Sequence, residues 1–200
     1  MTYRRKDAFY RRARAAGYRA RSAYKLAELD RRFGLIRRGD LVVDLGGWPG
    51  GWLQVILEAI GEEGRVVGVD AVAIPPLGAP NLLLVTGDVH DLTTTQAVLD
   101  YLGRRADVVL SDLAPKLTGV RATDEARCDD LVATMLRLLP VLLRPGGRLL
   151  TKLFMGPSHE ALLERLRRQF EEVKVTRPDA TRRGSAELYA ACLNHAPKRE

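Results

Sequence analysis

The sequence predicts an α/β fold: a seven-stranded, mostly parallel sheet with its last strand antiparallel and helices on both faces. From residue 41 on, apolar runs of strand length alternate with segments of helical periodicity, which is typical of a parallel sheet with crossover helices. Of the 200 residues, 46% are hydrophobic, enough to bury one core. No apolar run approaches the ~20 residues that cross a bilayer, so we expect a single domain over residues 1–200 and no membrane partner.

Two basic helices are expected before the sheet, over residues 3–16 and 20–33, with Gly17 between them. The second helix carries an apolar stripe that includes Leu26 and Leu29 at helical spacing. This stripe predicts that the second helix docks on the body of the domain.

The sheet is expected to follow in regular alternation. LVVDLG is a buried strand run, WLQVILEAIG is a helix that ends at Gly61, and Pro145-Gly146-Gly147 is a turn into the fifth strand. The final two strands have a short link without a helix, which predicts that they pair antiparallel. The expected strands are 41–46, 65–71, 81–88, 106–114, 148–155, 171–178 and 186–194, and the expected helices are 52–61, 93–103, 125–144 and 158–170.

The basic residues gather at the N-terminus. Residues 1–26 hold nine Lys and Arg against one Asp, a charge of +8, and the remaining residues together carry −1. Tyrosines and a phenylalanine are interleaved with the arginines, which indicates phosphate contacts and base stacking on an RNA partner. A pair of solvated amphipathic helices and a mitochondrial transit peptide are the alternatives. The expected RNA-binding residues are Arg11, Arg12, Arg14, Arg19 and Arg21, within a helical element of residues 1–35.

The turn after the first strand reads DLGGWPGGW and indicates a cofactor site. Gly46, Gly50 and Gly51 would let a ligand approach the backbone closely. The turn has neither the G-x-G-x-x-G pattern nor a Walker lysine, so it favours a cofactor without phosphates. A tight connection with two core tryptophans is the alternative. Trp48 either covers the cofactor or turns toward the core, and the sequence leaves both open.

Four strands end in aspartates, which are Asp44, Asp70, Asp88 and Asp112. The carboxyl ends of parallel strands share one edge of a sheet, where ligands bind. Asp70 is placed to accept hydrogen bonds from a ribose diol, and Asp88 to meet an adenine amino group. Each acid alone is also explained as a turn or capping residue. Together the acids suit a cationic cofactor such as a sulfonium.

The chain resembles the FtsJ/RrmJ family of 2′-O-ribose RNA methyltransferases, from about Gly17 to about Leu193. The shared stretches include RARSAYKLAEL, VVDLGGWPGGW, GDVHD, VVLSDLAPKLTG, GGRLLTKLF and RRGSAELY. The resemblance implies a Rossmann-like class I methyltransferase that uses S-adenosylmethionine. It also implies cofactor contacts at Gly50, Trp52, Asp70, Asp88 and Asp112, and a catalytic set of Lys25, Asp112, Lys152 and Glu187. The family usually has two small residues before the proline of the turn, where this chain has Gly47 and Trp48.

Lys152 is the candidate general base for the ribose hydroxyl, or a group that orients it. Burial and Lys25 favour its neutral amine, whereas Asp112 favours the ammonium and would orient it. Glu187 would position Lys25 or the ribose.

The resemblance implies methyl transfer to a uridine of large-subunit ribosomal RNA, naked or in the assembled subunit. Separately from the resemblance, we expect a monomer in the cytoplasm. The DLAP motif favours an oxygen acceptor over an amine. The alternatives are a methyltransferase for transfer RNA or a messenger cap, a non-catalytic RNA-binding relative, and a nicotinamide-dependent dehydrogenase.

Cysteine and histidine usage adds two expectations. Cys128 and Cys192 lie far apart without a CxxC pattern, which indicates reduced thiols. His90, His159 and His195 are scattered, so no metal site is expected.

Overall fold

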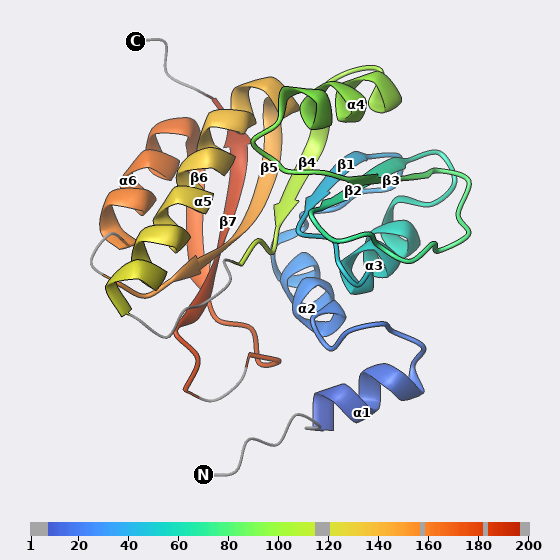
Figure 1. The fold of residues 1–200 in the computed structure, drawn as a ribbon, viewed down its shortest axis with the longest axis horizontal. Coiled ribbons are helices and arrows are strands. Elements are labelled where there is room, and N and C mark those ends of the chain that lie inside the picture. Colours follow the sequence, from blue (N-terminus) through green and yellow to red (C-terminus); the bar gives the residue numbers. More distant parts are fainter. Residues whose placement is uncertain (1–7, 115–120, 157–158, 182–183, 197–200) are drawn as a thin grey trace.

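A seven-stranded sheet with helices on both faces forms the body of the protein (Figure 1). The computed structural model describes residues 8–114, 121–156, 159–181 and 184–196. The strand order is β3-β2-β1-β4-β5-β7-β6. The strands are β1 Leu41–Leu45, β2 Arg65–Asp70, β3 Leu82–Thr86, β4 Ala106–Ser111, β5 Leu143–Phe154, β6 Phe170–Thr176 and β7 Glu187–His195.

β1 to β5 run parallel, and β7 is antiparallel to both of its neighbours, β5 and β6. The predicted α/β class and the antiparallel last strand are therefore confirmed. All five parallel strands point their carboxyl ends at the same edge of the sheet, and this edge positions the site described below.

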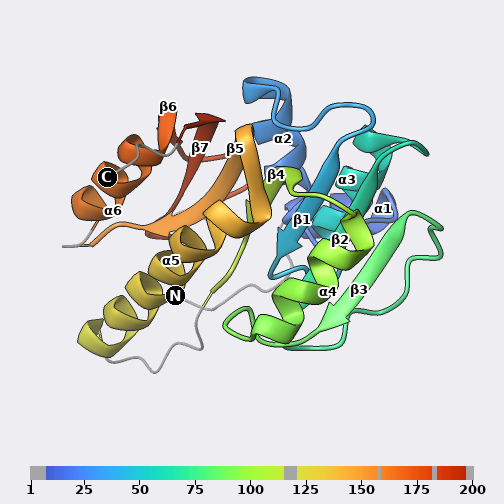
Figure 2. The same ribbon diagram turned by 90° about the horizontal axis from the view of Figure 1, so that it is seen from above.

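Helices cover both faces of the sheet (Figure 2), and the residues packed between the helices and each face form two separate apolar clusters. One face packs against α4, α5 and α6, through residues such as Val98, Leu139 and Leu166. The other face packs against α2 and α3, where Leu26 and Leu53 are fully buried. The helices are α1 Ala8–Ala15, α2 Ala23–Phe33, α3 Gly51–Ile60, α4 Leu92–Leu102, α5 Arg121–Leu142 and α6 His159–Gln169.

Two N-terminal helices are present, and the second is shorter than the expected 20–33. α1 begins at Ala8, and the expected helical residues 3–7 lie outside the described ranges. α2 begins at Ala23 and ends at Gly34, whose φ of 61° is the left-handed conformation that glycine adopts at a helix end.

The fifth strand begins at Leu143, before the expected start at residue 148, so the expected turn at Pro145-Gly146-Gly147 lies within the bounds of β5. The chain still bends there, because Gly146 has a left-handed φ of 70°. Leu143 pairs with Ala106, and the pairing shifts before Val108. A Cβ on Gly147 would lie 2.6 Å from the Leu143 side chain, so glycine is needed where the chain passes so close to itself.

A buried ion pair fixes α2 relative to β5. The Arg148 guanidinium of β5 lies 3.0 Å from the Asp40 carboxylate and donates to the Leu35 carbonyl at 2.7 Å, both in the connection after α2. α2 and β5 supply the two lysines of the site, so this contact helps to set their separation.

Within the described ranges, no helix is both long and apolar enough to cross a bilayer. Cys192 is a buried free thiol of β7, and the side chain of Cys128 lies outside the described residues.

Candidate active site

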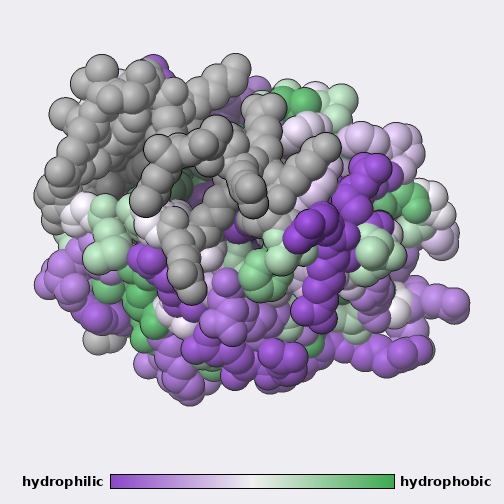
Figure 3. All heavy atoms as spheres, turned by 90° about the horizontal axis from the view of Figure 1, so that it is seen from below, coloured by the Kyte–Doolittle hydropathy of each residue, from purple (hydrophilic) through white to green (hydrophobic). Residues whose placement is uncertain are grey.

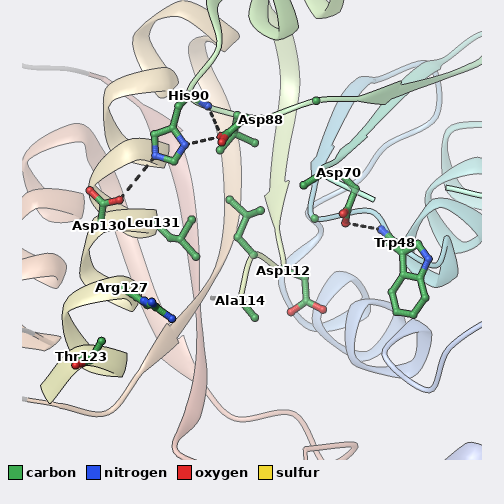
Figure 4. Close-up of a pocket in the computed structure, with 15 residues that line it drawn as sticks. Trp48, Asp70, Asp88, His90, Asp112, Ala114, Thr123, Arg127, Asp130 and Leu131 are labelled. Atoms are coloured by element: carbon green, nitrogen blue, oxygen red, sulfur yellow. Dashed lines mark hydrogen bonds and ion pairs between the residues drawn. The ribbon is translucent and has the colours of Figure 1, made fainter. Parts of the chain in front are cut away.

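A cavity of about 690 Å³ opens at the carboxyl edge of the sheet, between the loops after β1 to β4 and the helix α5 (Figure 4). Three of the expected acids line it, Asp70, Asp88 and Asp112. Gly46 lines it as well, at a φ of 87°. A Cβ there would lie 3.1 Å from the backbone nitrogen of Leu113, so only glycine lets the loops after β1 and β4 approach this closely.

Asp70 holds the glycine-rich loop in place at the end of β2. Its Oδ2 accepts from the Trp48 backbone at 2.9 Å, and its Oδ1 accepts from the Val72 backbone at 2.8 Å. The Trp48 side chain is 55% exposed and borders the cavity, away from the core. Of the two orientations that the sequence left open, the structure therefore excludes the one toward the core and places the indole at the border of the cavity.

Asp88 is joined to α5 through His90. Its Oδ1 accepts from the His90 backbone at 2.9 Å and lies 2.5 Å from the His90 Nδ1, and these contacts lower the pKa of Asp88. The other ring nitrogen of His90 lies 3.0 Å from the Thr134 hydroxyl and 3.8 Å from the Asp130 carboxylate. Sequence reasoning missed this connection, because the partners of a lone histidine cannot be read from spacing.

Asp44 lies beneath the loop, fully buried, and does not line the cavity as the strand-end pattern suggested. Among the described residues, neither of its carboxylate oxygens has a hydrogen-bond partner. Burial raises its pKa well above the usual range, and the charges of Asp112 and Asp70 add to this. An orphaned buried acid, with three carboxylates lining the cavity next to it, fits a cofactor that brings positive charge.

Gly50, Gly51 and Trp52 face the N-terminal segment, away from the lining of the cavity. A Cβ on Gly51 would lie 3.0 Å from that of Ala20, and the Trp52 indole is buried and donates to the Ser22 carbonyl at 2.9 Å. Any cofactor contact of these three residues is therefore restricted to their backbone at the start of α3, where the first N–H groups of a helix have no intrahelical acceptor.

Two of the arginines expected to bind RNA are used within the fold. Arg19 donates to the carbonyls of Pro75, Pro76 and Pro49, which lie in the loops after β2 and β1. Arg21 donates to the Ala180 carbonyl at 2.6 Å. Charge alone predicted a polyanion partner for these side chains, and acceptors so distant in sequence could not be foreseen. Arg11, Arg12 and Arg14 of α1 are exposed.

The lysine–carboxylate set is brought together as expected, at the edge of the cavity. The Lys152 Nζ donates to the Asp112 carbonyl at 2.7 Å and lies 3.0 Å from the Asp112 Oδ1, and its side chain is buried in β5. Lys25 of α2 forms an ion pair with Glu187 at the start of β7. Burial favours the neutral acid of Glu187, but the Lys25 ammonium outweighs it and lowers the Glu187 pKa.

Tyr189 joins the two pairs and was not predicted. It lies opposite Lys152 in the β5–β7 register, its hydroxyl donates to the Asp112 Oδ1 at 2.8 Å, and the Lys25 Nζ lies 3.5 Å from that hydroxyl. Burial, then the Asp112 and Glu187 charges, raise its pKa well above the usual value. Side chains alternate along a strand, so Glu187 and Tyr189 lie on the same face of β7, and this spacing could have suggested Tyr189 as a site residue. A tyrosine in a strand is more often interpreted as part of the hydrophobic core.

Chemically, the set places two lysine side chains next to a cavity lined by acids. Asp112 belongs to both parts, since it lines the cavity and holds Lys152. Within the described part of the chain, His, Cys, Asp and Glu form no group of three that could hold a metal ion. The arrangement suits proton removal from an acceptor hydroxyl that faces a bound cationic donor.

Comparison with known proteins supports this reading. The sequence model described as FtsJ-like methyltransferase matches residues 18–195. A Methanobrevibacter smithii protein named ribosomal RNA large subunit methyltransferase E is 40% identical over 193 residues, which cover 96% of this chain and 92% of the relative.

Solved structures share the fold. A Plasmodium falciparum protein, provisionally described as a ribosomal RNA methyltransferase, superposes with a TM-score of 0.80 at 26% identity, covering 90% of this chain and all of that one. Aeropyrum pernix fibrillarin, solved with natively bound S-adenosylmethionine, has a TM-score of 0.58 at 22% identity, covering 84% and 76% of the two chains.

Proposed function

This chain belongs to the FtsJ-like methyltransferase family, and on that premise we propose that it methylates the ribose 2′-hydroxyl of a uridine in large-subunit ribosomal RNA. The methyl donor is S-adenosylmethionine. The observation that carries the proposal is the double role of Asp112, which lines the cavity and also holds the Lys152 amine. One carboxylate thus joins the expected donor site to the expected acceptor site.

The residues at the cavity fit S-adenosylmethionine. Asp70 would accept hydrogen bonds from the ribose diol, and Asp88 would meet the adenine amino group. The backbone at the start of α3 would hold the methionine carboxylate, because a helix N-terminus favours an anion. Asp44 and Asp112 would stabilise the positive charges of the ligand. Trp48 and Gly46 would shape the walls.

The cofactor, when bound, supplies a methyl group on a cationic sulfur. Lys152 would take the proton of the 2′-hydroxyl as that oxygen attacks, or hold the hydroxyl in line for the attack. Asp112 fixes the Lys152 amine through two contacts and would stabilise the ammonium that proton transfer creates. Tyr189 holds the Asp112 carboxylate in position. The Lys25–Glu187 pair would orient the ribose.

The basic N-terminal element of residues 1–35 would hold the RNA, within a single domain of residues 1–200. Exposed Arg11, Arg12 and Arg14 of α1 are available for phosphates. Lys25 belongs to α2, so the element reaches the acceptor site directly. We propose that the protein acts as a monomer in the cytoplasm, on ribosomal RNA that is naked or within the assembled subunit.

The test is to map the methyl group. Purified protein is incubated with S-adenosylmethionine and either naked large-subunit RNA or the assembled subunit, and 2′-O-methyl positions are read by mass spectrometry. The expected result is one methylated uridine ribose in at least one of the two substrates. Methylation of a base, or activity confined to transfer RNA or capped RNA, would overturn the assignment.

A further inference from the structure

We propose that a second cavity, between α1, α2 and residues 179–180, binds the base of an unpaired RNA nucleotide adjoining the target. The inference rests on the proposed function, since it requires an RNA substrate. The cavity has a volume of about 270 Å³ and is separate from the cofactor cavity, because the two share no lining residue.

The α2 wall of this nucleotide cavity is one face of the helix. Tyr24, Ala27 and Arg31 recur at spacings of three and four residues, so they lie above one another. The small side chain of Ala27 leaves the hollow between the two larger ones. Phe9 and Arg12 of α1 close the opposite wall.

The chemistry of the walls suits a nucleobase. The Phe9 and Tyr24 rings lie 6.2 Å apart at 57°, and the Arg12 guanidinium lies 4.9 Å from the centre of the Tyr24 ring. Bases of single-stranded RNA stack on aromatic rings and on guanidinium planes, and the Arg12 and Arg31 charges match the adjoining phosphates.

Two acids, Glu28 and Asp179, line the cavity together with Arg12 and Arg31, and the Asp179 side chain is exposed. Glu28 accepts from the Asp179 backbone at 2.9 Å through Oε2, and its Oε1 lies 3.4 Å from the Arg32 guanidinium. Its charge is therefore matched within the protein.

The nucleotide cavity and the acceptor site both draw on α2. Tyr24 precedes Lys25 in the same turn of α2, and Arg21 binds the Ala180 carbonyl at the cavity wall. α1 lies at the bottom of Figure 1, and Figure 3 shows hydrophilic side chains over much of that face. A strand whose target ribose meets Lys25 can therefore place a neighbouring base between α1 and α2.

The sharpest variant is Ala27→Leu, which fills the hollow and keeps both rings and both arginines. Its matched control is Ala59→Leu on α3, because Ala27 and Ala59 are both partly buried at the edge of the same apolar cluster. The probe is a fluorescein-labelled single-stranded RNA of about 12 nucleotides, a length suited to one such site, titrated at constant salt. The measurements are RNA affinity by anisotropy and S-adenosylmethionine affinity by calorimetry.

Ala27→Leu is expected to weaken RNA binding by roughly 5- to 100-fold, the worth of one stacked base, with unchanged cofactor affinity. Ala59→Leu is expected to leave both affinities at the wild-type value. If Ala27→Leu bound RNA with wild-type affinity, the proposal that this cavity binds a base would be wrong. The binding assay needs no methylation, so its result stays separate from a failure of the proposed function.

Crosslinking of the wild-type protein keeps the test independent of how any variant folds. RNA containing 4-thiouridine is irradiated in the complex, and the modified peptides are mapped. Crosslinks at Phe9 or Tyr24 are expected. Crosslinks that avoid both rings would contradict the proposal.

Discussion

The two ends of the active-site cleft differ in whether their acids have partners within the protein. At the lysine end, Glu187 pairs with Lys25 and Asp112 with Lys152, and Tyr189 adds a hydrogen bond between the pairs. At the cofactor end, Asp44 has no partner among the described residues. In the lining that the structure describes, the cofactor cavity gathers four aspartates against one arginine, Arg127.

The difference shows which end depends on its ligand. The lysine end balances its charges within the protein, so its geometry is set before RNA arrives. The cofactor end carries excess negative charge, which a cationic ligand would offset. We expect substitutions at the lysine end to change the rate of transfer, and substitutions at the cofactor end to change affinity.

The largest expected effect is a loss of methyl-transfer rate without a loss of cofactor affinity. Lys152→Ala should lower kcat by about 1,000-fold, because a positioned acid–base group contributes roughly 100- to 10,000-fold. The affinity for S-adenosylmethionine, measured by calorimetry, should stay within about two-fold, since Lys152 does not line the cofactor cavity.

Lys174→Ala is the matched control, because Lys174 is an exposed β6 lysine that also contacts a carboxylate, that of Glu172. It should turn over like the wild type. Near-normal turnover of Lys152→Ala would contradict the assignment of the methyl-transfer rate to the lysine end.

Asp44→Asn is the corresponding change at the cofactor end. We expect roughly 5- to 10-fold weaker binding of S-adenosylmethionine, because Asp44 does not line the cavity and its charge would act on the cationic ligand through the loop, an interaction of about 1 kcal/mol. RNA affinity should not change. Calorimetry with the cofactor and anisotropy with RNA measure the two effects, and equal losses in both would show that the ends are not independent.

Tyr189→Phe tests whether the Tyr189 hydroxyl positions Asp112 at the lysine end. It removes the hydroxyl that donates to Asp112 and keeps the ring that packs against Trp52 at 6.0 Å. We expect kcat to fall roughly 5- to 10-fold and the free energy of unfolding to fall by about 1 kcal/mol. Steady-state kinetics and urea unfolding test this, and an unchanged kcat would remove Tyr189 from the positioning of Asp112.

The smallest expected effects are opposite pH dependences of stability without ligands. The raised pKa of Asp44 means that its contribution is complete below the ordinary carboxyl pKa of about 4 and is lost as pH rises through its raised value. The lowered pKa of Glu187 means that its contribution is present above the ordinary value and is lost as pH falls through its lowered one.

Urea unfolding between about pH 3 and pH 8 measures both dependences. Asp44→Asn should be more stable relative to the wild type at pH 8 than at pH 4. Glu187→Gln should lose less stability than the wild type on acidification. Parallel curves for the variants and the wild type would contradict the contrast between the two acids.

The order and type of the strands and helices of the body followed from hydrophobic periodicity, because each packs one apolar face on the sheet. The start of β5 did not, because Pro145-Gly146-Gly147 has the composition of a turn. Leu143 already pairs with Ala106 before those residues, and the pairing resumes at Arg148 after an irregularity in which Gly146 has a φ of 70°. Composition does not reveal that early pairing.

The candidate site was predicted in part. The four positions proposed for catalysis were predicted from motifs shared with the family. Tyr189 was not predicted, because its place opposite Lys152 depends on the cross-strand register, which no local pattern specifies. Arg19 and Arg21 were assigned to RNA by their charge, yet carbonyl oxygens brought close by folding engage them. A sequence gives the charge of a side chain, and the fold decides what neutralises it.

The three carbonyl contacts of Arg19 tie the N-terminal segment to the loops after β1 and β2, and these loops border the cofactor cavity through Trp48 and Ala71. An RNA that steadies this segment also steadies the loops after β1 and β2. Reciprocity of binding then requires that RNA and cofactor raise each other's affinity by the same factor. The two substrates should therefore bind cooperatively, and cofactor calorimetry with and without RNA would measure that factor.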